Sequence, residues 1–328
     1  MPTIPQLLFH RRYRGIAFVA IALALAAPLS GCSFRKFAAN SVGNSLASGP
    51  DVFSSDNDPE LVRDAVPFGL KTMESLLAVV PKNRNLLLAA CRGFTQYAYA
   101  FVQGDADDIE ATDYARATEL RVRARNLFLR ARDYGLRDME LGYKGVGAEL
   151  RTNPDAAVKR FRVKDVPTLF WTAAAWGSAI SLGKDQADLL ADLPTVRALI
   201  DRSAQLDEGF EGGAIHEALI LLDALPPALG GSPERARKHF ERAVELSNGT
   251  HASPYLTMAQ SVSVMTQNRK EFHELLEQAL TIDPDRDSTQ RLPNIIAQRR
   301  AKKLLERENE YFLDDASPAD STSPAESH

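Results

Sequence analysis

The 328-residue chain has little of the material that builds most recognisable sites. Its two cysteines are too few for a disulfide framework, and its 19 glycines and 18 prolines are near average usage, which excludes a collagen-like or low-complexity body. The net charge of −4 argues against a nucleic-acid binder, because that class needs a clustered basic surface. The 45% hydrophobic and 25% charged residues are typical of a globular chain.

Catalytic motifs are also missing. His216-Glu217 and His273-Glu274 each lack the second histidine, four residues later, that places two zinc ligands on one helical face. Neither a G-x-S-x-G motif, nor a phosphate loop, nor a dinucleotide-binding glycine fingerprint occurs. The sequence therefore predicts a protein that is not an enzyme and carries no cofactor or metal, with His216 as a packed or hydrogen-bonded histidine.

The first residues are typical of an export signal. Arg11, Arg12 and Arg14 precede an apolar run over residues 15–27, and no acidic residue occurs before Cys32. The run spans roughly 20 Å as a helix, which is shorter than the hydrocarbon core of roughly 30 Å. A cleaved signal is therefore favoured over a permanent transmembrane helix.

The run ends at Leu29-Ser30-Gly31-Cys32, which resembles the bacterial lipobox. In that motif the signal, here residues 1–31, is cut off and the cysteine receives a diacylglycerol. Acyl chains gain about 0.8 kcal/mol per buried methylene, so two or three of them hold a protein on a membrane. We expect Cys32 to anchor an acidic, extracytoplasmic protein; ordinary signal cleavage and an uncleaved anchor are the alternatives.

The mature chain divides by composition into three segments. Residues 32–57 form a lipidated tether with a weak apolar pattern at Phe34, Phe37 and Leu46, compatible with one short helix. Residues 58–313 show apolar spacing of three to four with no β-branched alternation, which predicts a single all-α domain. Residues 314–328 are too polar to bury a core and are expected to be disordered.

An internal repeat refines the all-α prediction. An apolar-x-x-small-x-x-apolar pattern, which lets a neighbouring helix approach closely, recurs with Ala131, Ser203, Ala243 and Ala279 at its centre. Helical-hairpin units of roughly 36 to 40 residues are typical of tetratricopeptide-like arrays, which bind partners on a concave face. We therefore predict a tetratricopeptide-like stack of antiparallel helical hairpins.

Two apolar features stand out within this domain. Residues 167–182 carry no charge and contain both tryptophans, which indicates a helix that is buried centrally or lines an apolar cavity. If a cavity exists, its expected aromatic lining is Tyr97, Tyr99, Phe101, Trp171 and Trp176, although core packing explains these residues equally well. Cys91, in an apolar segment, is expected to be a buried core thiol.

The basic run at residues 299–303 is expected to form a solvated helical face. Basic residues at this spacing on an amphipathic helix are usually exposed and paired with nearby acids. The run therefore carries no functional prediction of its own.

Several segments together resemble the T-component family of tripartite ATP-independent periplasmic (TRAP) transporters. They occur in order over about residues 32–313 and read DNDPELV (56–62), QYAYAFV (96–102), AAAWG (173–177), LGGSPERAR (229–237), HFERA (239–243) and LPNIIAQRRA (292–301). The resemblance implies a lipid-anchored all-α protein of tetratricopeptide-like hairpins that forms homotrimers. It also implies association with the periplasmic solute-binding P-component and a ligand that is apolar or an organic acid. It transfers no catalytic residue.

The leading hypothesis is thus a non-enzymatic lipoprotein adaptor of a TRAP system, anchored on the periplasmic side of the envelope. It would hold the P-component near the membrane and pass a small apolar solute through its helical body. A repeat scaffold for envelope or cell-wall assembly shares the anchor and the array but needs no cavity. A cell-wall hydrolase would need paired acids with opposed pKa values.

Overall fold

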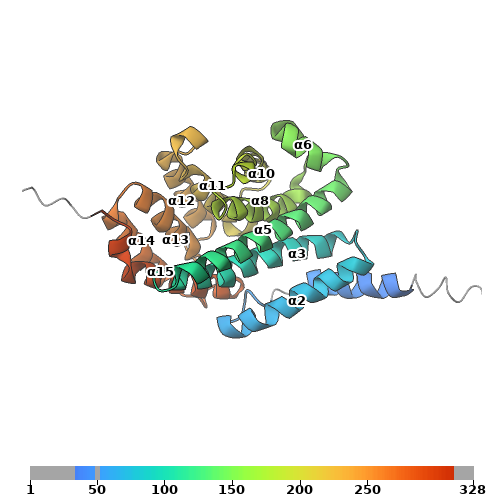
Figure 1. The fold of residues 1–328 in the computed structure, drawn as a ribbon, viewed down its shortest axis with the longest axis horizontal. Coiled ribbons are helices and arrows are strands. Elements are labelled where there is room, and N and C mark those ends of the chain that lie inside the picture. Colours follow the sequence, from blue (N-terminus) through green and yellow to red (C-terminus); the bar gives the residue numbers. More distant parts are fainter. Residues whose placement is uncertain (1–33, 49–51, 314–328) are drawn as a thin grey trace, which may run out of the picture.

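The protein, in a computed structural model, is built from helices joined by short turns (Figure 1). The structure describes residues 34–48 and 52–313, and these ranges contain no strand. The all-α prediction is therefore confirmed. The predicted signal peptide (1–31), the lipidation site Cys32 and the predicted disordered tail (314–328) lie outside the described residues.

The chain begins with a helix over residues 34–48, called here the N-terminal helix. The later helices, each joined to the next by a turn or a short 3-10 segment, are α2 Pro59–Val79, α3 Arg84–Tyr97, α4 Gly104–Ile109, α5 Tyr114–Gly142, α6 Val146–Thr152, α7 Pro154–Ala157, α8 Val166–Ser181, α9 Ala187–Leu190, α10 Leu193–Leu206, α11 Ala214–Asp223, α12 Pro233–Leu246, α13 Ser253–Met258, α14 Arg269–Thr281 and α15 Arg291–Glu306. Two π-helical turns, η1 (Ala98–Gln103) and η6 (Ala259–Ser263), continue α3 and α13.

Helix starts follow from local sequence. The Asp58 side chain accepts hydrogen bonds from the amides of Glu60 and Leu61, with Pro59 at the first helical position of α2. Ser232 caps α12 in the same way and is followed by Pro233. These caps satisfy amides that have no partner inside the helix.

The helices pack in two alternating sets. Helices α3 and α8 contact each other, as do α11, α13 and α15, whereas α5, α10, α12 and α14 alternate with them along the chain. The small residues of the predicted repeat lie on this second set, where Ala131, Ser203, Ala243 and Ala279 are all fully buried. The repeat thus marks close helix contacts. The finer prediction, a tetratricopeptide-like stack of hairpins, stays a prediction.

Helix α8 is the central helix of the larger core. It packs on α5, α10 and α3, and most of its residues are buried. It approaches α5 closely at Gly135, where an added Cβ would lie 1.9 Å from Oγ1 of Thr172. The prediction that the uncharged segment forms a buried central helix is therefore confirmed.

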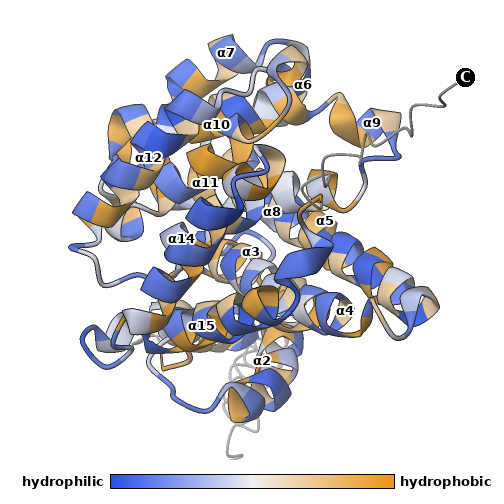
Figure 2. Cartoon of the chain, turned by 90° about the vertical axis from the view of Figure 1, so that its left-hand side faces the viewer, coloured by the Kyte–Doolittle hydropathy of each residue, from blue (hydrophilic) through white to orange (hydrophobic). Residues whose placement is uncertain are grey.

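The two ends of the array meet. The amide of Leu292 in α15 donates to the Ser54 carbonyl at 2.9 Å, and Arg299 of α15 pairs with Glu60 of α2 at 2.6 Å. Figures 1 and 2 both place α15 beside α2 at the lower edge. The array therefore closes on itself.

Candidate functional site

Trp171 of α8 faces a polar partner. Its indole Nε1 donates to Oε1 of Glu211 at 3.3 Å, and the guanidinium of Arg92 lies 5.5 Å from the ring centroid. Glu211 has a φ of 45°, in the left-handed region that side chains other than glycine rarely adopt. Strained backbone of this kind is frequent at ligand sites. Trp171 is therefore tied to the strained turn that precedes α11.

Trp176 lies on a different face of α8 from Trp171. Its Nε1 donates to Oδ2 of Asp192 at 3.0 Å, and the Arg132 guanidinium lies 5.2 Å from its ring. Only 3% of Trp176 is exposed. The two tryptophans therefore face different neighbours, as their five-residue spacing predicts.

Tyr97 and Phe101 pack on each other where α3 passes into η1. Their ring centroids are 5.8 Å apart, and Phe101 is 4% exposed. The guanidinium of Arg63, which is held by Asp105, lies 5.0 Å from the Phe101 ring. This pair joins a small core with Val62, next to α15. Core packing accounts for the position of Tyr97 and Phe101. That these two residues line a cavity stays a prediction.

Tyr99 lies among charged groups from three helices. The Arg300 guanidinium of α15 is 4.5 Å from its ring, an arrangement that favours the cation. Burial raises the pKa of the Tyr99 hydroxyl, the charge of Arg300 lowers it, and the carboxylates of Glu217 and Asp107 raise it further. The aromatic residue therefore lies at the point where α4, α11 and α15 meet η1.

Glu217 of α11 is held by hydroxyl groups. It accepts hydrogen bonds from Ser253 at 2.7 Å and Thr257 at 2.9 Å, both on α13. Burial raises the pKa of this carboxyl, and the two hydroxyls oppose that effect. Within the described ranges no lysine, arginine or histidine forms a salt bridge with Glu217. It is thus a partly buried acid that two neutral donors stabilise.

Arg300 and Asp107 complete the group. Nη2 of Arg300 donates to Oδ2 of Asp107 at 2.8 Å, and Arg121 donates to the other oxygen at 3.3 Å. Burial raises the pKa of Asp107, whereas Arg300 and Arg121 oppose it. Nη1 of Arg300 is buried and has no hydrogen-bond partner among the described residues. We call Tyr99, Asp107, Glu217 and Arg300 the central polar cluster.

Both π-helical turns lie beside this cluster. Tyr99 belongs to η1, and η6 directly follows the helix that carries Thr257, which binds Glu217. A π-turn inserts one residue into a helix and redirects the side chains that follow, and such turns are frequent at functional sites. The π-turn η1 therefore sets the direction of Tyr99, whereas Ser253 and Thr257 precede η6 and are positioned by α13 itself.

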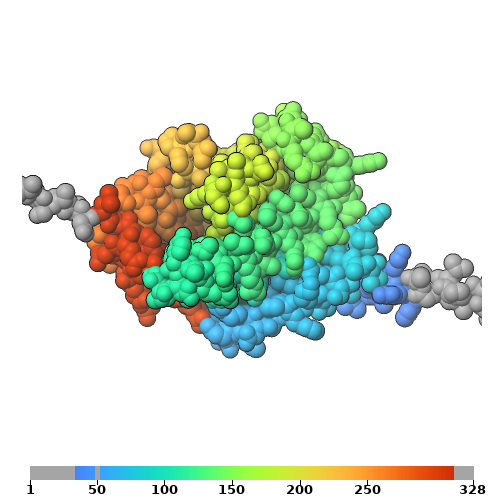
Figure 3. Space-filling model, viewed as in Figure 1, coloured from blue at the N-terminus to red at the C-terminus, as the bar shows by residue number. Residues whose placement is uncertain are grey.

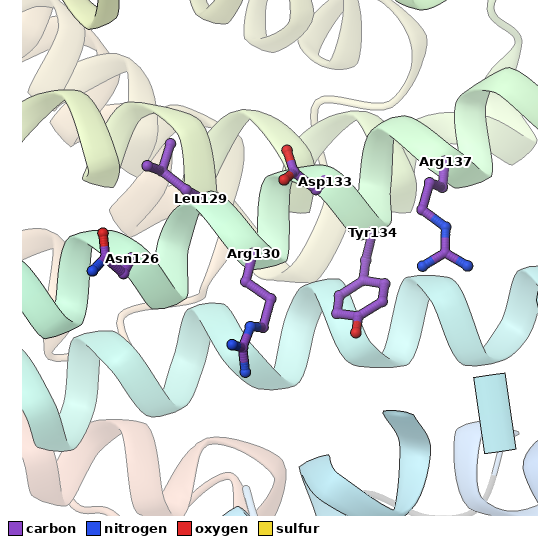
Figure 4. A pocket seen from close by; sticks show the side chains of 6 residues that line it. All are labelled: Asn126, Leu129, Arg130, Asp133, Tyr134 and Arg137. Atoms are coloured by element: carbon purple, nitrogen blue, oxygen red, sulfur yellow. The ribbon is translucent and has the colours of Figure 1, made fainter. Parts of the chain in front are cut away.

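Two surface depressions lie outside the cluster. One, of about 360 Å³, runs along α5 and is lined by Asn126, Leu129, Arg130, Asp133, Tyr134 and Arg137 (Figure 4). The other, of about 450 Å³, lies among turns and is lined by Gly212, Leu246, Ser247, Asn248, Thr250, His251, Arg286, Asp287 and Ser288. Both linings are mixed in polarity and neither contains a predicted aromatic residue.

Metal clusters and membrane-spanning helices are both absent from the residues that the structure describes. No group of three or more histidine, cysteine or carboxylate side chains within it could hold a metal ion. None of its helices is both long and apolar enough to cross a bilayer.

The prediction that His216 is a packed or hydrogen-bonded histidine is confirmed. His216 is 8% exposed, and its Nδ1 lies 2.9 Å from Nδ1 of His239.

The prediction that the basic run over residues 299–303 is a solvated face is wrong in one respect. Arg299 pairs with Glu60 near solvent as expected, but Arg300 turns inward, with 17% of its side chain exposed. Arg300 is one step farther round α15 and therefore faces Tyr99. The sequence analysis missed Glu217 and Arg300 as site residues because each resembles an ordinary helical surface charge.

The fold and cluster define a closed all-helical protein with partly buried charges where its helices meet. Residues 55–312 match the model of the TRAP transporter T-component, and the chain belongs to this family. It is similar to an uncharacterized protein of Treponema pallidum (strain Nichols), with 28% identity over 304 residues, 87% of this chain and 94% of that protein. The family is an accessory component of an envelope transport system and is not a known enzyme family.

Proposed function

We propose that the protein is a periplasmic, lipid-anchored adaptor that binds the solute-binding P-component of a TRAP system. The observation that carries the proposal is the family match over residues 55–312. The tetratricopeptide-like arrangement of hairpins belongs to the same proposal, because arrays of that kind present extended binding surfaces. The alternation of two helix sets and the buried small residues of the repeat support it.

The proposal includes a small ligand, apolar or an organic acid, inside the helical body. The central polar cluster is the region that best suits the polar end of such a ligand. Nη1 of Arg300 is a charged donor with an unused hydrogen bond, and a carboxylate is the natural acceptor for a guanidinium. The Tyr99 ring, 4.5 Å from the Arg300 guanidinium, supplies apolar surface beside it.

Anchoring through acylated Cys32 and assembly into homotrimers complete the proposed function. The sequence supports the anchor through its basic, apolar and lipobox segments in succession. Native mass spectrometry of the protein purified without its acyl chain would measure both the trimer and any retained ligand. A monomer that carries no ligand would contradict both the proposed trimer and the proposed ligand. The adaptor role is tested separately.

The adaptor role is tested by affinity purification from detergent-solubilised membranes. A tag placed after His328 keeps the N-terminus free for processing. We expect a TRAP solute-binding protein to be enriched with the wild-type protein. Recovery of envelope-assembly or cell-wall proteins, without any solute-binding protein, would contradict the adaptor and favour the alternative scaffold.

A further inference from the structure

Exposed phenylalanine is concentrated at the start of the described chain. The exposed fractions of Phe34, Phe37, Phe53 and Phe68 are 73%, 71%, 40% and 79%. No other phenylalanine in the described ranges is exposed. Single exposed apolar residues are ordinary, but two large exposed rings three residues apart on one helix, Phe34 and Phe37, indicate a contact surface.

The N-terminal helix cannot turn its two phenylalanines inward, because its opposite face is fixed. Gly43 is buried against Leu86, so closely that an added Cβ would lie 2.4 Å from the Leu86 side chain. Nδ2 of Asn83 also donates to Oδ1 of Asn40 at 2.9 Å. At 100° per residue, Phe34 and Phe37 point away from Gly43.

The chemistry next to these rings suits a lipid surface. Arg35 and Lys36 lie between the two phenylalanines in the sequence, are both exposed, and flank the ring face on opposite sides of the helix. Aromatic rings beside basic side chains are typical of helices that lie in the headgroup region of anionic membranes. Two residues of extended chain span at most roughly 7 Å, so an acyl group on Cys32 would hold Phe34 at the membrane surface.

We propose that Phe34 and Phe37 insert into the headgroup boundary of the membrane while Arg35 and Lys36 contact anionic lipid. This membrane contact rests on the proposed lipid attachment at Cys32 and extends it. An acyl anchor alone leaves the body free to tilt, whereas a second contact through a helix packed on Leu86 fixes its orientation. The N-terminal helix and α2 then face the bilayer, and α12 with its preceding turn lies on the opposite side (Figures 1 and 3).

The test places a tryptophan at the proposed contact. The acylated Phe37→Trp variant is reconstituted into vesicles of phosphatidylethanolamine and phosphatidylglycerol with brominated acyl chains, which quench tryptophan on contact. The matched control is Leu229→Trp, because Leu229 is 52% exposed and lies in the turn before α12. Wild-type protein gives the baseline of Trp171 and Trp176. A second arm replaces the acyl group with a hexahistidine tag before Ser33 and nickel-chelating lipid.

We expect the added tryptophan of the Phe37→Trp variant to be quenched at least twofold more than that of the Leu229→Trp variant in both arms. The double change Arg35→Glu and Lys36→Glu should reduce this quenching on anionic vesicles. Quenching in the tethered arm with no flotation of the cell-made protein would support the membrane contact and contradict acylation of Cys32.

Two results would overturn the membrane contact. The first is equal, weak quenching of the Phe37→Trp and Leu229→Trp variants in the tethered arm. The second is protection of the Phe37→Trp variant from aqueous iodide only when the P-component is added, which would favour a protein partner for this surface.

Discussion

Arg300 and Asp107 are 193 residues apart in the sequence, and their side chains meet at 2.8 Å. This pair joins α15 to α4, so the last long helix is tied to the first third of the chain. Lys303 and Arg307 of the same region also bind α4, through the Asp108 side chain and the Asp107 carbonyl. In an open repeat array each unit contacts only its neighbours, whereas closure makes the two ends depend on each other.

The closing contact should therefore be measurable in a double-mutant cycle. Combining Asp107→Asn with Arg300→Gln should give a coupling free energy of about 1 kcal/mol in urea unfolding, because the arginine is largely enclosed. The exposed pair Arg116 and Glu119, at a similar 2.7 Å, is the control and should give about 0.3 kcal/mol. Equal coupling in the two cycles would contradict a structural role for closure.

Glu217→Gln should change how stability depends on pH. Burial raises the pKa of the Glu217 carboxyl in the folded state, so its contribution to stability is lost as pH rises through that folded pKa. Glutamine keeps the shape and an acceptor for Ser253 and Thr257 but never ionises. We expect the variant to gain stability relative to wild type as pH rises above the ordinary titration range of a glutamate, about 4 to 5.

Glu274→Gln is the control for this experiment, because Glu274 is exposed on α14. Its unfolding free energy should follow the wild-type value across the same pH range. If Glu217→Gln also follows wild type at every pH, the carboxyl is not held in a desolvated environment.

Two glycine substitutions separate helix propensity from close packing. Gly69→Ala in α2 meets nothing within 4 Å and should stabilise the protein by about 0.5 to 1 kcal/mol. Gly135→Ala in α5 offers the same gain in propensity but clashes with Thr172, so it should destabilise by about 1 to 3 kcal/mol. Thermal unfolding of both variants checks the pair, and a stabilised Gly135→Ala variant would show that α5 and α8 do not approach so closely.

Cys91 should behave as an inert core thiol. It is fully buried, and burial raises its pKa to about 12, so the reactive thiolate is scarce at neutral pH. We expect labelling by an aromatic disulfide reagent at about pH 8 only at the rate of unfolding, with rapid labelling in urea. Fast labelling of folded protein that lacks Cys32 would contradict the burial.

Helical periodicity predicted the local structure well. Ala131 and Ala243 are buried where the repeat pattern placed them, because side-chain spacing reports which face of a helix is apolar. Periodicity could not predict that α15 packs against α4 and closes the fold. Arg300, within the basic run 299–303, was expected to be solvated, since a single helix carries no information about which distant helix covers it.

The candidate site was found only in part. Trp171 stood out because its helix carries no charge, and Tyr99 was included with it as an aromatic residue. Glu217 was missed because its partners, Ser253 and Thr257, lie on another helix and are ordinary in sequence. The π-turn that carries Tyr99 depends on one extra residue, which leaves no visible mark on the periodicity.

The adaptor function is tested most directly by binding of the purified protein to the P-component of a TRAP system from the same bacterium. Isothermal titration calorimetry with both proteins free of detergent measures the affinity and the ratio of the two chains. The account predicts saturable binding at a fixed ratio, unaffected by removal of the acyl group. Absence of any binding at concentrations well above those of the periplasm, by a protein that remains folded, would contradict it.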